Sequence, residues 1–148
     1  GTIKLPGTKS LPQKLEVIYN ELDRLIKLYN PDEFAIESAF YGKNVQSAMK
    51  IGYARGVSML AAVHNGLPVS EYAPREVKKS VVGNGAASKT QVQYMVNNLL
   101  GLKSGKVIFD ETDALAVAIC HSFKIKAPFP TKKSWKAFVE ANPGRVIQ

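Results

Sequence analysis

The stretch "FAIESAF", residues 34–40, places one carboxylate inside an otherwise apolar run. Phe34, Ala35 and Ile36 are typical of a buried strand, and Glu37 follows them directly. An isolated carboxylate is costly to bury, so such a group is usually neutral, paired with a cation or bound to a metal. Glu37 therefore needs a partner, which the rest of the chain has to supply.

The segments around this stretch alternate between helical and extended patterns. Ser10 can cap a first helix that ends before Asn30, and Ser88 with Gln91 forms a capping-box pattern. Helices are predicted at 11–29, 44–65, 74–82, 88–100, from about 110, and at 132–142, and strands at 1–5, 33–38 and 67–73. This order predicts an α/β fold with parallel strand pairing and helices on both faces of the sheet.

The composition predicts one domain with a basic surface. Of 148 residues, 45 % are apolar, and 20 Lys and Arg oppose 12 Asp and Glu, which gives a net charge of +8. Such a surplus favours a polyanion such as nucleic acid as the partner, and the alternative is a solvated basic surface. The one cysteine, Cys120, lies in an apolar helical run and is expected to pack in the core. No apolar run approaches the roughly 20 residues of a membrane span, and we expect a cytoplasmic protein.

Two further acids stand together at the start of the last long helix. Asp110 and Asp113 are three residues apart and therefore share one helix face. They could serve as a cap and a first-turn acid. However, the apolar run "ALAVAI" that follows predicts a buried helix, and two like charges at its start favour a cation. Together with Glu37 they form a set of carboxylate oxygens of the kind that Mg²⁺ prefers as ligands. Two metal ions about 4 Å apart are used in phosphodiester cleavage.

Three segments carry a resemblance to a known family: "FAIESAFYGKNVQSAMKIGYARGV", "EYAPREVKKSVVGNGAASKTQV" and "DETDALAVAICH". Over about residues 1–123, the chain resembles the RuvC-type Holliday-junction resolvases, which are crossover junction endodeoxyribonucleases. The resemblance implies a ribonuclease H-like fold with a mixed sheet and helices on both faces. It also implies a homodimer that cuts four-way DNA junctions symmetrically in recombination and repair, with Mg²⁺ or Mn²⁺ and a branch-migration motor as a partner.

The resemblance also implies roles for single residues. Glu37, Asp110 and Asp113 fall on catalytic metal ligands of the family, which holds two ions in each active site. Phe40 falls on an aromatic residue that stacks on a base at the junction centre. The alternative for Phe40 is a place in the core.

Basic residues of the family's DNA contact fall on Lys43, Lys78 and Lys89, with Lys78 and Lys89 near the scissile phosphate. Each of these lysines could equally be a solvated surface residue. The helix at 44–65 resembles the family's dimer-forming helix, and its many small residues allow another helix to come close.

One family motif is not found in this sequence. The family begins with a strand that carries an aspartate followed by Pro-Gly, and this aspartate is the fourth metal ligand. None of the four aspartates, Asp23, Asp32, Asp110 and Asp113, lies in an N-terminal apolar run. We therefore expect an N-terminally truncated copy without the first hairpin, with the nuclease domain at 1–123 and a basic extension at 124–148.

Three alternatives follow from the same residues. "GNGAASKT", residues 83–90, approaches a Walker A loop, but Ser88 replaces its second glycine and a helix end precedes it. A catalytically inactive junction-binding relative is favoured by the missing aspartate. A ribonuclease H-like nuclease with another nucleic-acid substrate is disfavoured by Phe40 and the small-residue helix.

Overall fold

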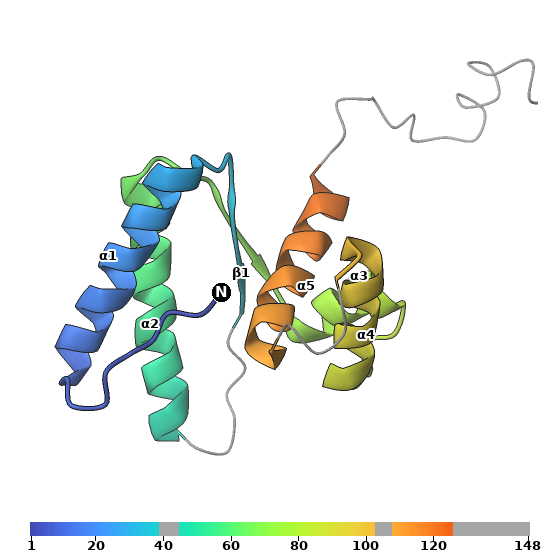
Figure 1. Ribbon diagram of the computed structural model, residues 1–148, viewed down its shortest axis with the longest axis horizontal. Coiled ribbons are helices and arrows are strands. Elements are labelled where there is room, and N and C mark those ends of the chain that lie inside the picture. The colour runs from blue at the N-terminus through green and yellow to red at the C-terminus, as the bar shows by residue number, and fades with distance from the viewer. Residues whose placement is uncertain (39–44, 103–107, 126–148) are drawn as a thin grey trace, which may run out of the picture.

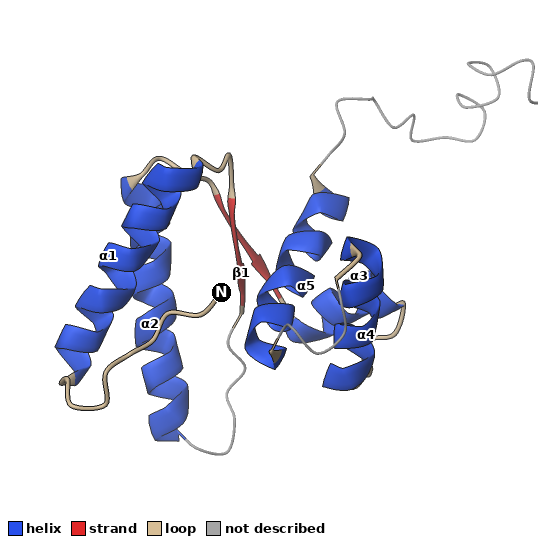
Figure 2. Cartoon of the chain, in the orientation of Figure 1, coloured by secondary structure: helices blue, strands red, loops and turns tan. Residues whose placement is uncertain are grey.

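The computed structural model describes residues 1–38, 45–102 and 108–125. Its elements follow the order α1 (Leu11–Tyr29), β1 (Phe34–Glu37), α2 (Val45–His64), β2 (Val69–Tyr72), α3 (Pro74–Val82), α4 (Lys89–Leu100) and α5 (Phe109–Lys124). β1 and β2 form a parallel pair, with α1 and α2 on one face and α3, α4 and α5 on the other (Figures 1 and 2). The predicted α/β architecture with helices on both faces is confirmed.

Local signals set most of the element boundaries. The Ser10 backbone N–H donates to Gln13 Oε1 at 2.9 Å at the start of α1, and the Ser88 backbone N–H donates to Gln91 Oε1 at 2.8 Å at the start of α4. Asn30 ends α1 in the left-handed region at φ 45°, and Gly101 ends α4 at φ 63°. These ends agree with the predicted helices because capping depends on neighbouring residues alone.

The strand predicted at residues 1–5 is wrong, since this segment has no regular secondary structure. An extended segment becomes a strand only when its backbone groups pair with a neighbour, and no ladder bond reaches it among the described residues. The sheet in the described part of the chain is therefore wholly parallel rather than mixed. The register pairs Phe34 with Val69 and Glu37 with Tyr72, so both strands end at the same edge.

The main core lies between the sheet and the α3–α4–α5 layer. Val96, Thr112 and Cys120 are the largest fully buried side chains, and the Thr112 hydroxyl donates to the Ile108 carbonyl at 3.0 Å. The packing role predicted for Cys120 is confirmed, since this free cysteine is buried. The loop at 83–88 joins two helices, which also confirms that it is no strand-to-helix Walker loop. None of the helices in the described ranges is both long and apolar enough to cross a membrane.

Candidate active site

A pocket of about 240 Å³ lies where β1 ends. Glu37 is the last residue of β1, Lys89 is the first residue of α4, and Asp113 lies in the first turns of α5. Parallel strands bring their carboxyl ends to one edge, and α3, α4 and α5 present their N-terminal parts there (Figure 1). Eight residues line the pocket: Glu37, Pro74, Val77, Lys78, Lys89, Val92, Asp113 and Ala116.

Charges of both signs meet in this pocket. Lys89 Nζ lies 3.0 Å from Asp113 Oδ2, which makes an ion pair between α4 and α5. Partial burial raises the pKa of Glu37, the negative charge of Asp113 raises it further, and Lys89 and Lys78 act in the opposite direction. The pKa of Lys89 is raised, first by its hydrogen bond to Asp113 and also by the charges of Asp110 and Glu37. The pocket thus holds like-charged carboxylates together with its own lysines as counterions.

The predicted site residues are only partly brought together. Glu37 and Asp113 share the pocket with Lys78 and Lys89. Asp110 is an exposed second residue of α5 and does not line the pocket, although its charge acts on Lys89. Asp110 is also not the helix cap, because Ile108 holds that position and donates its backbone N–H to Glu111 Oε2 at 3.4 Å. Phe40 and Lys43 lie outside the described residues.

Glu37 is less buried than the sequence predicts. Phe34, Ala35 and Ile36 are partly buried and Glu37 is exposed to solvent at the end of the strand. Glu37 is the last residue of β1, and the strand is paired along one edge in the described structure. Glu37 therefore meets solvent on one side and the pocket on the other, where a charged ligand can approach it.

The donor chemistry of the pocket fits a hard divalent cation, because Glu37 and Asp113 present carboxylate oxygens around one space. Repulsion between these two carboxylates contributes to the raised pKa of Glu37, and a bound cation would reduce this repulsion. Among the described residues, no group of three or more His, Cys, Asp and Glu is arranged to hold a metal ion. The described residues thus bring two carboxylates to this pocket.

Sequence reasoning missed a second polar cluster at the other end of α5. Tyr72 Oη and His121 Nδ1 are hydrogen-bonded at 2.8 Å, and His121 Nε2 lies 3.1 Å from Glu33 Oε2. Tyr72 is buried and Lys124 Nζ lies 5.1 Å from the centre of its ring. These contacts link the last turn of α5 to the chain before β1 and to the end of β2. No spacing in the sequence signals them, since the residues are far apart in the chain.

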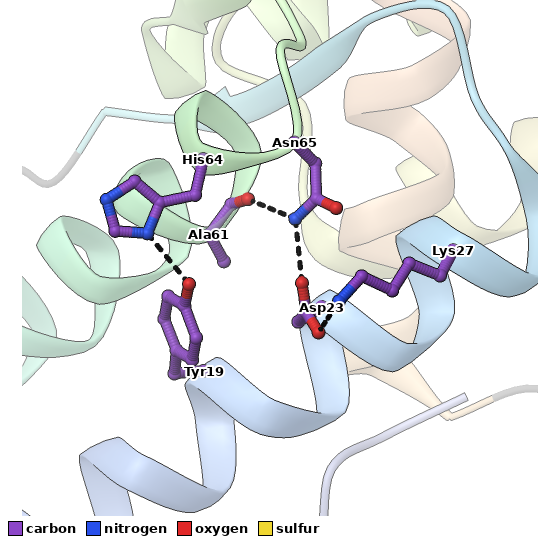
Figure 3. Close-up of polar contacts among 6 residues, drawn as sticks. All are labelled: Tyr19, Asp23, Lys27, Ala61, His64 and Asn65. Carbon is purple, nitrogen blue, oxygen red and sulfur yellow. Dashed lines mark hydrogen bonds and ion pairs between the residues drawn. The ribbon is translucent and has the colours of Figure 1, made fainter.

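A third polar cluster joins α1 to α2 (Figure 3). The Asn65 amide donates to Asp23 Oδ1 at 2.9 Å and to the Ala61 carbonyl at 2.8 Å, while Lys27 Nζ donates to Asp23 Oδ2 at 2.7 Å. Tyr19 Oη and His64 Nδ1 lie 2.8 Å apart in the same region. Lys27 and Asn65 hold the pKa of the Asp23 carboxyl below its ordinary value.

One face of α2 is apolar and exposed. Gly52 and Gly56 lie on this face, and a Cβ atom added at either glycine would meet no atom of the described chain within 4 Å. The exposed large apolar residues at helical spacing around them are Val45, Met49, Tyr53, Leu60 and Val63. We call these five residues and the two glycines the α2 stripe.

Solved structures with the same α/β fold give the class: the fold is ribonuclease H-like. The Thermus thermophilus RuvC structure matches with a TM-score of 0.74 and 31 % identity, over 82 % of this chain and 73 % of that chain. The same organism's RuvC in complex with Holliday junction substrate matches with a TM-score of 0.76 over the same shares.

Sequence comparisons give the family. The family model described as crossover junction endodeoxyribonuclease RuvC matches residues 1–121. A RuvC of Salinibacter ruber is 44 % identical over 148 residues, which cover 99 % of this chain and 83 % of that protein. A RuvC of Saccharophagus degradans is 50 % identical over 121 residues, which cover 82 % of this chain and 69 % of that protein. The chain belongs to the RuvC family of crossover junction endodeoxyribonucleases.

Proposed function

We propose that this protein is a structure-specific endonuclease that resolves four-way DNA junctions by paired, symmetric nicks. The observation that carries the proposal is the pocket at the end of β1, where Glu37 and Asp113 face Lys78 and Lys89 in a member of a nuclease family. A solved relative is RuvC in complex with Holliday junction substrate, which supports the same kind of substrate here. The net charge of +8 suits a polyanionic partner.

Glu37, Asp110 and Asp113 are the proposed ligands of divalent ions, Mg²⁺ or Mn²⁺, with two ions in each active site. Bound ions of this kind make a water more acidic and stabilise the leaving oxygen in phosphodiester cleavage. The protein's own part is to hold carboxylates around one pocket and to place ammonium groups beside them. Lys78 and Lys89 are proposed to contact the scissile phosphate; in the structure, Lys89 pairs with Asp113.

Paired nicks need two active sites related by a two-fold axis, and we assign the dimer contact to the α2 stripe. The open space at Gly52 and Gly56 lets a second helix approach closely, and the exposed apolar residues beside them supply area to bury. A branch-migration motor is the further partner proposed for the dimer. We also propose a cytoplasmic location.

Phe40 is proposed to stack on an unpaired base at the junction centre, and Lys43 to contact the DNA nearby. Unstacking a base step costs a few kcal/mol, and stacking on an aromatic side chain offsets about 1–3 kcal/mol of that cost. Phe40→Ala is therefore expected to slow cleavage while junction binding is retained. Residues 124–148 are proposed as a basic extension of the nuclease domain at 1–123.

The test is cleavage of a synthetic four-way junction with each strand labelled in turn, with Mg²⁺ present and protein in excess. The expected result is one nick in each of two opposite strands, at symmetric positions, and no comparable cutting of a linear duplex of the same sequence. Cutting of linear duplex at the same rate would instead indicate a nuclease without junction specificity.

The second candidate function is a catalytically inactive junction-binding protein. It is favoured by the absence, among the described residues, of a group of three or more metal-binding side chains. The same labelled junction separates the two candidates. Tight and specific junction binding without any nick, in both Mg²⁺ and Mn²⁺, would support the inactive relative.

A further inference from the structure

A second hollow lies on the other side of α3 from the active-site pocket. Val77 and Lys78 line the active-site pocket, whereas Arg75 and Lys79, on the opposite face of the same helix, line this hollow. It measures about 990 Å³ and is bounded by α3, the loop after it and the last turn of α5. No residue of the active-site pocket takes part in it.

The charge of the hollow is positive. Glu76, its one acidic residue, is paired with Lys124. Arg75 and Lys79 are exposed, and neither side chain has an ion-pair or hydrogen-bond partner within the described ranges. Two cations one helical turn apart therefore face solvent without a counterion, which is a suitable arrangement for binding phosphates.

The hollow is also lined by a loop that packs closely on α3 and by an aromatic side chain. A Cβ atom at Gly85 would lie 3.0 Å from the Arg75 carbonyl oxygen, so the loop is held closely against the start of α3. Phe123, in the last turn of α5, is 63 % exposed, although a large aromatic side chain normally gains by burial. An exposed ring beside unpaired cations is the combination that binds a nucleic-acid strand through its phosphates and its bases or sugars.

We propose that this hollow, formed by α3, the loop at Gly85 and the end of α5, is a second DNA contact separate from the active site. Arg75 and Lys79 bind backbone phosphates of DNA beyond the strand that is cut, and Phe123 packs against a base or a sugar. The inference rests on the proposed function, because a junction is large enough to contact both faces of α3.

The test compares wild-type protein with the Arg75→Ala/Lys79→Ala double variant in equilibrium binding of a labelled four-way junction, with divalent ions chelated. Each phosphate contact adds about −0.9 to the slope of log K against log salt concentration. The double variant is expected to bind about tenfold more weakly at 0.1 M salt and to lose close to two units of that slope. Its cleavage rate at saturating protein is expected to equal that of the wild type, because neither residue lies in the active-site pocket.

The matched control is Lys4→Ala/Lys9→Ala, which removes two exposed lysines elsewhere on the chain. The charge-preserving variant Arg75→Lys/Lys79→Arg is expected to keep the wild-type slope. Wild-type binding by the Ala double variant, or an equal loss in the lysine control, would overturn the inference. Titration with a linear duplex distinguishes failure of this inference from failure of the proposed function. If wild-type protein binds duplex as tightly as the junction, the proposed function is refuted. A smaller salt slope for duplex binding in the Ala double variant would still support DNA contact at the hollow.

Discussion

The two helical layers differ in how completely they bury their apolar surface. The α3–α4–α5 layer holds a closed core with β2, in which Val96 and Cys120 are fully buried. In the α1–α2 layer, the buried residues are Ile26, Ala61 and Ala62. That layer is also joined by the polar contacts around Asp23 and keeps the α2 stripe exposed. This difference fits the proposed function, in which one layer positions the active site and the other binds a second copy.

A large effect on assembly is expected at the α2 stripe. Gly56→Leu should leave the protomer folded, since there is open space at this position, but should obstruct close approach of another helix. We expect the dimer dissociation constant to rise by at least about tenfold, which corresponds to about 1.4 kcal/mol. Sedimentation velocity over a range of concentrations measures it. Lys50→Leu, on the exposed surface of α2 but outside the stripe, is the control and should not change assembly.

A truncation in the core of the α3–α4–α5 layer should lower the free energy of unfolding more than one on the exposed surface of the α1–α2 layer. Val96→Ala removes buried methyl groups from a side chain with 0 % exposure and should lower the free energy of unfolding by about 2 kcal/mol. Leu28→Ala, at a 60 % exposed position of α1, should change it by less than about 0.5 kcal/mol. Urea denaturation measures both, and equal losses would mean that the two layers do not differ in this way.

A smaller, pH-dependent effect is expected at the contact between α1 and α2. The hydrogen bond from Lys27, and then that from Asn65, lowers the pKa of Asp23 in the folded protein from its ordinary value of 3.8. A lowered folded pKa means that the stabilisation is present above that ordinary value and is lost as the pH falls through the folded pKa. Asp23→Asn should therefore reduce stability at neutral pH, and the difference should disappear in strong acid.

Thermal unfolding from pH 7 down to pH 2 follows the Asp23 effect. Glu21→Gln is the matched control, because Glu21 pairs with Arg24 on its own helix and has no hydrogen bond or ion pair to α2 among the described residues. A difference between Asp23→Asn and wild type that stayed constant at every pH would show that the ionised carboxylate is not responsible.

Local features were predictable from the sequence, whereas tertiary ones were not. The caps at Ser10, Ser88 and Gly101 depend on neighbouring residues, and the helices they bound form as predicted. The segment at 1–5 has an extended pattern, but a strand needs a partner that the pattern cannot supply.

The candidate site also has features that the sequence predicts and features that only the fold creates. The acids Glu37 and Asp113 could be selected because an acid in an apolar run and a pair at a helix start are visible in the sequence. The ion pair between Lys89 and Asp113 and the contacts of His121 could not, since they join residues that only the fold brings together.

Glu37 is the central residue of the proposed active site, and single-turnover cleavage of a four-way junction by Glu37→Gln tests this assignment most directly. The substitution keeps the size of the side chain and removes the charge that faces the pocket. We predict that the cleavage rate falls while junction binding is retained. The fall should exceed the roughly 10- to 100-fold loss that is typical when a residue that only supports a metal ligand is removed. Glu71→Gln, a carboxylate of β2 that pairs with Arg55 of α2, should cut at the wild-type rate. Cleavage by Glu37→Gln at the wild-type rate would contradict the assignment of this pocket as the active site.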